Sequence, residues 1–155
     1  MPETPPDPAT AQRQRWMAVL ARASAMQLRA HLAGLPPLAD FVVLRGPEAG
    51  LVMLRGRAGG TGQRFNMGEM TVTRCAVRTV GGQVGHAYVA GRDAAQAELA
   101  ARLDAALQDP ASHDALQAAV IAPLAAAQAA AREEIRRKAA ATRVQFFTMA
   151  TMRSA

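Results

Sequence analysis

Residues 69–91 read EMTVTRCAVRTVGGQVGHAYVAG, and this stretch decides the fold. Two runs rich in valine, threonine and other β-forming residues flank the pair Gly81-Gly82. Such runs predict β-strands, and two adjacent glycines between them predict a tight hairpin turn. With a two-residue loop, Arg78 would lie opposite Gly85. We therefore expect an antiparallel sheet built outward from this hairpin.

Two more strands are predicted on the N-terminal side of the hairpin. The segments DFVVLRG (40–46) and GLVMLRGR (50–57) are apolar, and the turn residues of GPEAG lie between them. Before them, two short helices are expected, one over 11–23 capped by Thr10 and one capped by Ser24 that stops at Gly34.

The last third of the chain is predicted to be helical. Asp93 is expected to cap a helix whose leucines recur every four residues, namely Leu99, Leu103 and Leu107. Further helix is predicted from Ser112 onward, with an interruption at Pro123 and a long final segment to about 141 that Glu133–Arg137 and Glu134–Lys138 pairs support.

The predicted fold class is α+β, an antiparallel four-stranded meander with two short N-terminal helices and a helical C-terminal third. One domain over 10–155 follows a Pro-rich leader, 1–9, which is expected to be disordered. Half of the chain is hydrophobic, but alanine supplies much of that half, and aromatic residues make up only 4% of the chain. Because alanine buries little area, this domain is expected to use a partner for part of its burial.

The charge balance is strongly basic, with 18 lysines and arginines against 12 acidic residues, a formal net charge of +6. Only Lys138 is a lysine, so 18 − 1 = 17 of the basic residues are arginines. Guanidinium groups suit bidentate contacts with anions. The arginines are dispersed and no helix-turn-helix, zinc-finger or aromatic-basic RNA motif is present, so nucleic-acid binding is disfavoured.

A cytoplasmic location is expected from cysteine usage and from the N-terminus. The single Cys75 allows no intramolecular disulfide, and the N-terminal residues are proline-rich and acidic rather than those of a signal peptide. No run approaches the roughly 20 apolar residues that span a bilayer. No membrane association is therefore expected.

The glycine-rich segment GGTG (59–62), with Arg57 and Arg64 beside it, has two interpretations. Backbone N–H groups of such a segment can cradle a phosphate. It is not a P-loop, because no Gly-Lys-Ser/Thr follows, and Phe65 stands where a dinucleotide motif needs its third glycine. The alternative is a glycine-rich β connection that lets two backbones approach closely, and the motif evidence favours it.

Arg74 and Arg78 are four residues apart on a predicted strand and therefore project from the same face. They suit either an anion or a partner subunit, although a solvated polar face is at least as good an explanation. The predicted anion- or partner-contact residues are Arg57, Gly59, Gly60, Thr61, Gly62, Arg64, Arg74, Arg78 and Arg92.

No catalytic residue and no metal site is predicted. Cys75 and His86 would share one face of the hairpin, but a zinc site needs at least three protein ligands and His31 and His113 are far along the chain. A Cys–His nucleophile pair also needs a third, orienting group. The preferred interpretation is a small buried cysteine beside a half-exposed histidine.

The apolar tail 142–152 contains FFTM at 146–149. Phe146, Phe147 and Met149 would either fold back on the sheet or form an exposed apolar patch, and such patches usually mark interaction surfaces. Docking of this tail into a partner is the preferred interpretation.

Six blocks carry a family resemblance. They are RQRWM (13–17), GGTGQRF (59–65), GEMTVTRCAVR (68–78), GHAYVAGRD (85–93), IAPL (121–124) and TRVQFFTM (142–149). In this order and spacing the chain resembles the PhnG family, the G subunits of the bacterial carbon–phosphorus lyase core complex. The blocks span nearly the whole chain after the leader.

The resemblance implies a non-catalytic, assembly-stabilising subunit in organophosphonate catabolism. Its partners would be the H, I and J subunits, with an ATPase-like L subunit joining transiently. Such a complex replaces the adenine of ATP by an alkylphosphonate, giving a ribose 1-alkylphosphonate 5-triphosphate. No cofactor is expected on this chain: ATP is a substrate of the complex, and the iron–sulfur and SAM chemistry belongs to the J subunit. The alternative is a stand-alone anion- or nucleotide-binding module.

Overall fold

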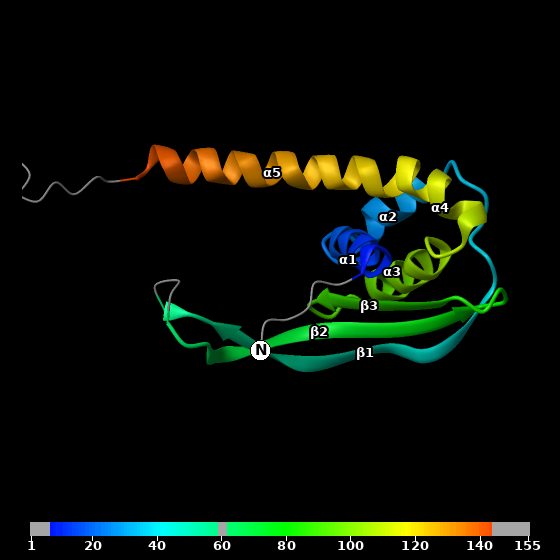
Figure 1. Ribbon diagram of the computed structural model, residues 1–155, viewed down its shortest axis with the longest axis horizontal. Helices are drawn as coiled ribbons and strands as arrows, with labels where there is room; N and C mark the ends of the chain where they lie inside the picture. Colours follow the sequence, from blue (N-terminus) through cyan, green and yellow to red (C-terminus); the bar gives the residue numbers. More distant parts are fainter. Residues whose placement is uncertain (1–6, 59–61, 144–155) are drawn as a thin grey trace, which may run out of the picture.

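A three-stranded antiparallel sheet and a layer of helices make up the part of the chain that the structure, a computed structural model, describes: residues 7–58 and 62–143 (Figure 1). The helices lie on one face of the sheet, and the strand order is β1-β2-β3. The elements are α1 (Pro8–Leu20), α2 (Ala25–Leu32), β1 (Phe41–Gly56), β2 (Phe65–Thr79), β3 (Val84–Ala90), α3 (Ala94–Ala106), α4 (Pro110–Leu116), the π-helical turn η2 (Gln117–Ile121) and α5 (Ala122–Ala141).

The predicted four-stranded meander is wrong, because its first two strands are a single strand, β1. The turn residues of GPEAG stay inside this strand, which pairs with β2 from Phe41 to Gly56. Register shifts between Val43 and Arg45 and between Arg45 and Glu48 each place an extra residue on β1, as β-bulges do. Pro47 lies without a pairing partner inside the second of these shifts, on an edge strand, and such bulges are where a sheet tolerates proline.

The hairpin between β2 and β3 has a longer loop than predicted. Residues 80–82 form the turn, in which the Gly82 N–H donates to Thr79 O (2.9 Å) and Gly82 has φ +90°. The register therefore shifts by one residue: Arg78 lies opposite Val84, and Val77 lies opposite Gly85. The predicted Arg78–Gly85 pairing is wrong because three loop residues, not two, separate the strands.

The N-terminal helices begin at local hydrogen-bonding caps. Ser24 caps α2 as predicted, in a reciprocal box with Gln27. Asp7, not Thr10, caps α1: its side chain accepts from the Thr10 N–H (3.0 Å) and hydroxyl (2.7 Å). An aspartate followed by a proline at the first helical position is a strong start signal, so the helix begins earlier than predicted.

The C-terminal helices form one continuous rod from α4 through η2 to α5. Asp109, not Ser112, caps α4. Pro123 does not break the rod, because the π-helical turn η2 precedes it and changes the local hydrogen-bonding pattern. The proline lacks the N–H that would serve the Ala119 carbonyl, and the His31 Nδ1 lies 3.1 Å from that oxygen instead.

The core lies between the sheet and the helices, and it is built from few large side chains. Trp16 and Leu20 share the buried face of α1, as predicted; Ala23 is buried too, but α1 ends at Leu20 and not at residue 23 as predicted. Leu103 of α3 and its C-cap residue Leu107 are also fully buried, and Leu99 packs partly against this core. Alanines on α3 allow it to approach β3 closely. A Cβ on Gly85 would meet the Ala101 carbonyl oxygen and lie 2.7 Å from the Ala105 nitrogen, so only glycine fits there.

The rod Pro110–Ala141 is long and apolar enough, by length and composition, to cross a membrane. This differs from the prediction that no run approaches that length, since alanine counts as apolar. Length and composition are weak evidence, and the first part of the rod packs on the body through Leu116, Val120, Ile121 and Leu124. The second part carries the Glu134–Lys138 ion pair that was predicted (2.8 Å), while Glu133 pairs with Arg136 rather than Arg137 (3.2 Å).

Candidate functional site

Two segments project from the body toward the same side in Figure 1, and helices cover neither of them. The first is the hairpin arm, which comprises the distal parts of β1 and β2, residues 50–58 and 62–70. Since β3 pairs only with Val72–Arg78 of β2, the sheet there has just two strands. Exposed apolar side chains occupy this arm: Leu51 (63% exposed), Met53 (50%), Leu54 (41%), Phe65 (49%), Met67 (65%) and Met70 (36%).

The pairing register shows that part of this apolar surface continues the buried face of the sheet. Thr73 and Cys75 are buried under the helices. Leu51 pairs with Thr71, two residues before Thr73, and therefore points to the same face. Exposed apolar side chains, Leu51 and Met53, thus continue this face where the helical layer ends, which is the pattern expected of a surface that another chain covers.

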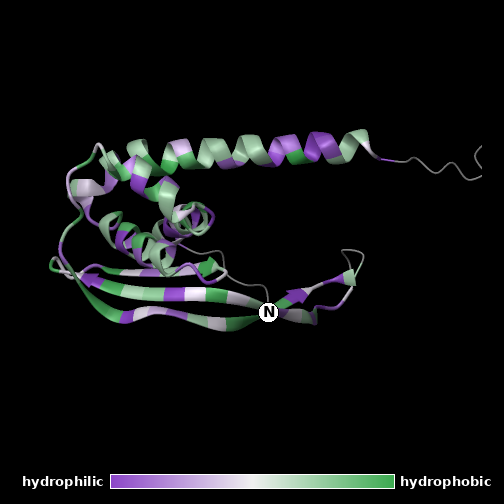
Figure 2. Ribbon diagram, turned by 180° about the vertical axis from the view of Figure 1, so that it is seen from behind, coloured by the Kyte–Doolittle hydropathy of each residue, from purple (hydrophilic) through white to green (hydrophobic). Residues whose placement is uncertain are grey.

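The second projecting segment is the C-terminal part of α5, residues 129–141, where every residue is exposed. Of α5, Leu124 alone is buried, and Ile135 is 66% exposed. Figure 2 shows hydrophilic residues gathering on this part of the helix. Tertiary packing usually supplies most of a helix's stability, so three turns of helix without packing partners among the described residues also suit contact with another chain.

The outer face of the sheet, opposite the helices, carries a small charged cluster. The Arg74 Nε donates to Glu48 Oε1 (2.7 Å), and Arg45 Nη1 lies 3.4 Å from the same oxygen. This hydrogen bond from Arg74, together with the charge of Glu48, raises the pKa of the Arg74 guanidinium. Arg74 therefore already has an anionic partner within the chain, while Arg78 on the same face is exposed.

The predicted contact residues do not form one site. Arg57, Gly62 and Arg64 line an open cavity at the end of the hairpin arm, together with Arg55 and Gln63. Arg74 and Arg78 lie on the outer face near β3, and exposed Arg92 follows β3. Gly59, Gly60 and Thr61 lie outside the described residues, as do the predicted docking residues Phe146, Phe147 and Met149 of the tail.

Cys75 and His86 lie on opposite faces of the sheet, so the prediction that they share a face is wrong. Cys75 pairs with Ala87, whereas His86 pairs with Ala76, because of the one-residue register shift. Burial, assisted by the negative charge of Glu98, raises the pKa of the Cys75 thiol. Within residues 7–58 and 62–143, no group of three or more His, Cys, Asp and Glu side chains is placed to hold a metal ion.

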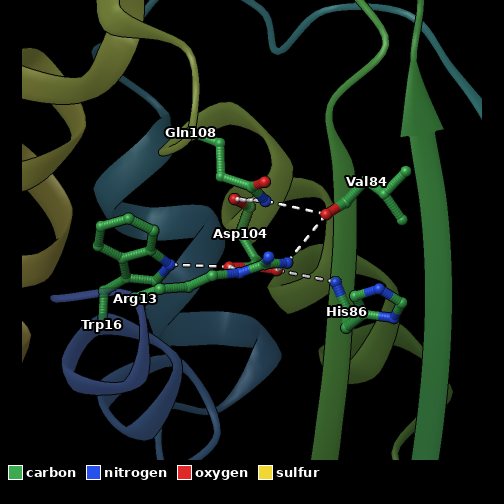
Figure 3. Close-up of polar contacts among 6 residues, drawn as sticks. All are labelled: Arg13, Trp16, Val84, His86, Asp104 and Gln108. Atoms are coloured by element: carbon green, nitrogen blue, oxygen red, sulfur yellow. Dashed lines mark hydrogen bonds and ion pairs between the residues drawn. The ribbon is translucent and has the colours of Figure 1, made fainter. Parts of the chain in front are cut away.

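The most extensive buried polar network centres on Asp104, which the sequence analysis did not single out (Figure 3). This carboxylate is completely buried on α3. Its Oδ1 accepts from Trp16 Nε1 (2.8 Å) and Arg13 Nε (3.1 Å), and its Oδ2 accepts from Arg13 Nη2 (2.7 Å) and the His86 N–H (2.9 Å). The network therefore joins α1, α3 and β3 at one point.

Two more bonds extend this network to the start of β3. Arg13 Nη2 and Gln108 Nε2 both donate to the Val84 carbonyl oxygen, each at 2.9 Å. All four hydrogen bonds to the carboxylate come from groups that the fold holds in place, which is how a buried charge is tolerated. We interpret the network as a fixed support for the hairpin rather than as a reacting group. The signal in the sequence that could have identified Asp104 is its position directly after Leu103, a residue of the predicted apolar stripe.

These features define a class of protein: a small α+β protein with two uncovered projecting segments that suit packing against other chains. Comparison with known proteins agrees. The family model "Phosphonate metabolism protein PhnG" matches residues 11–152. A protein of Rhizobium meliloti (strain 1021), named alpha-D-ribose 1-methylphosphonate 5-triphosphate synthase subunit PhnG, is 45% identical over 153 residues, which are 95% of this chain and 94% of the relative. The chain belongs to the PhnG family.

Proposed function

We propose that this chain is a non-catalytic subunit that assembles and stabilises the carbon–phosphorus lyase core complex. The Rhizobium relative is named as a subunit of the synthase of alpha-D-ribose 1-methylphosphonate 5-triphosphate, and the reaction proposed here is the general form of that synthesis, formation of a ribose 1-alkylphosphonate 5-triphosphate. In this proposal, an alkylphosphonate displaces adenine from ATP at the anomeric carbon of the ribose. The bond-making groups, and any iron–sulfur or SAM chemistry, belong to partner subunits, and the complex works in the cytoplasm.

The observation that carries the proposal is the uncovered hairpin arm. Six apolar side chains of this arm are between 36% and 65% exposed, and Leu51 among them lies on the face that the helices cover in the rest of the sheet. Burying an apolar side chain of this size contributes about 1.5–3 kcal/mol, so covering several of them would support a stable interface. The H, I and J subunits are the proposed partners, with the L subunit joining transiently.

Co-expression with the H, I and J subunits tests this proposal. The variant Leu51→Glu/Met53→Glu places two charges on the arm and should reduce co-purification of the partners at least about tenfold, because each charge would have to be desolvated on assembly. The matched control is Met26→Glu on α2, which is also an exposed apolar residue (78%) but lies away from both projecting segments. It should assemble like the wild type.

Growth on an alkylphosphonate as sole phosphorus source gives the second measurement. The arm variant should grow poorly and the Met26→Glu control normally, while circular dichroism of both purified chains stays unchanged. If the arm variant assembles and grows like the wild type, the hairpin arm is not the contact surface. If the wild-type chain itself fails to co-purify with the three subunits, the proposed function is wrong.

A further inference from the structure

We propose that the end of the hairpin arm binds a triphosphate group through Arg55, Arg57 and Arg64. This inference rests on the proposed function, since it names the part of the substrate that this chain would contact. The starting observation is a charge pattern: residues 49–68 contain these three arginines and no acidic residue. The segment is therefore a purely cationic stretch of the chain.

The pairing register brings the three arginines together. Arg55 pairs with Asn66, and Gly56 pairs with Phe65. Continuing the alternation of side chains places Arg57 and Arg64 on the face that carries Arg55 and Asn66. A register shift between Leu54 and Arg55 adds one residue to β2 at this point and so sets which residues share that face.

An open cavity of about 410 Å³ lies among these side chains. Arg55, Arg57, Gly62, Gln63 and Arg64 line it, and no carboxylate of the described residues does. The described residues offer no ion pair to these three arginines. By contrast, Arg45 and Arg74 both pair with Glu48, and Arg13 pairs with Asp104. The cluster is therefore the one of these arginine groups whose charge no acidic side chain balances.

The chemistry of the cluster favours a ligand with several adjacent negative charges. Three guanidinium groups around one cavity repel one another, and an anion with a matching number of charges removes that repulsion. Planar guanidinium groups donate two hydrogen bonds to a phosphoryl group in a fixed geometry. The Gln63 amide adds further donors without adding charge. A chain of linked phosphoryl groups satisfies all of these donors better than a single phosphate does.

The cluster is also placed where a substrate bound mainly by other subunits could reach it. It lies at the end of the projecting hairpin arm, away from the helical body (Figure 1). The triphosphate could come from ATP or from the ribosyl 5-triphosphate product. Both carry the same group, and the inference concerns that group only.

Titration calorimetry of the full-length chain tests the site, with inorganic tripolyphosphate, pyrophosphate and phosphate as probes. Tripolyphosphate should bind at least about tenfold more tightly than phosphate, and Arg55→Gln/Arg57→Gln/Arg64→Gln should weaken its binding at least about tenfold. The control Arg15→Gln/Arg22→Gln/Arg29→Gln removes the same charge from exposed positions elsewhere and should weaken binding less than about threefold. Adding ATP as a fourth probe shows whether the ribose and base contribute.

Two results would overturn the inference: equal loss of binding in both triple variants, which would indicate attraction to net charge only, or no tripolyphosphate binding by the wild-type chain. Co-purification with the H, I and J subunits is measured for the same variants. The hairpin-end variant should still assemble, because its apolar contacts are intact. A wild-type chain that assembles but does not bind tripolyphosphate would reject this site and keep the proposed function, whereas failure of the wild-type chain to assemble would reject the proposed function.

Discussion

The Asp104 network predicts that one isosteric change will remove a large part of the stability of the fold. In Asp104→Asn, the remaining carbonyl oxygen can still accept from two of the four donors that now surround the carboxylate. The new NH2 group then faces the other two, which are also donors. If it occupies the Oδ2 position, it opposes Arg13 Nη2 and the His86 N–H.

The expected cost is about 3 kcal/mol. A buried donor left without a partner costs about 1–3 kcal/mol, and removing one partner of a buried ion pair costs about 3–5 kcal/mol. We take the lower end, because the Arg13 side chain is 32% exposed and water can solvate part of its charge. Since a domain of this size has about 5–15 kcal/mol of stability, the loss is a substantial fraction of the total.

Urea unfolding followed by Trp16 fluorescence measures this effect directly. Trp16 is the single tryptophan, it is 5% exposed, and its indole N–H binds the carboxylate in question. The unfolding midpoint of Asp104→Asn should fall by roughly 1–2 M urea at an unchanged slope. The control Asp93→Asn removes a charge from the N-cap of the same helix but keeps the capping hydrogen bond, so its free energy of unfolding should change by less than about 0.5 kcal/mol.

A double-mutant cycle with Arg13→Gln separates the ion pair from the rest of the network. Arg13→Gln should weaken the fold less in the Asp104→Asn background than in the wild type, because the two residues interact. If the free energy of unfolding of Asp104→Asn is within about 0.5 kcal/mol of that of the wild type, the network does not stabilise the fold and our interpretation of the network is wrong.

Two further predictions concern the sheet. Gly85→Ala should destabilise the chain by about 1–3 kcal/mol in thermal unfolding, because the new Cβ would push α3 away from β3. The control is Gly50→Ala, whose new Cβ would have no atom within 4 Å. Equal melting temperatures of the two variants would contradict the close approach of α3 to β3. Burial raises the folded-state pKa of the Cys75 thiol above its ordinary value of about 9.0. The contribution of the protonated thiol to stability is therefore fully present below about pH 9.0 and is lost as pH rises through the folded-state pKa. The free energy of unfolding of the wild type should therefore fall relative to that of Cys75→Ala above about pH 9. If the difference between the two free energies does not change with pH, this prediction is wrong.

Local signals in the sequence predicted several elements correctly. Ser24 and Asp93 cap their helices, and the buried stripes of α1 and α3 lie where the helical periodicity placed them. These features depend on residues within one or two turns of each other, so the sequence contains all the information they need. The α+β class follows from the same local patterns.

The errors came from features that depend on pairing between distant segments. The residues of GPEAG have strong turn propensity, yet β2 offers a continuous partner and bulges absorb the extra residues, so they remain in β1. A single additional residue in the 80–82 loop placed Cys75 and His86 on opposite faces. A register change of one residue moves a side chain to the other face, because the side-chain period of a strand is two. Propensity is a property of each residue and does not fix which residues pair, so it cannot resolve such a change.

The sequence by itself determined the helix caps, the apolar stripes, the excess of arginine and the family to which the chain belongs. Only the tertiary structure decided which charges are balanced. It buried Asp104 against Arg13, paired Arg74 with Glu48, and left Arg55, Arg57 and Arg64 around one open cavity. The physical reason is that the energy of a charge depends on its burial and on its neighbours in space, and residues 13 and 104 become neighbours only when the chain folds.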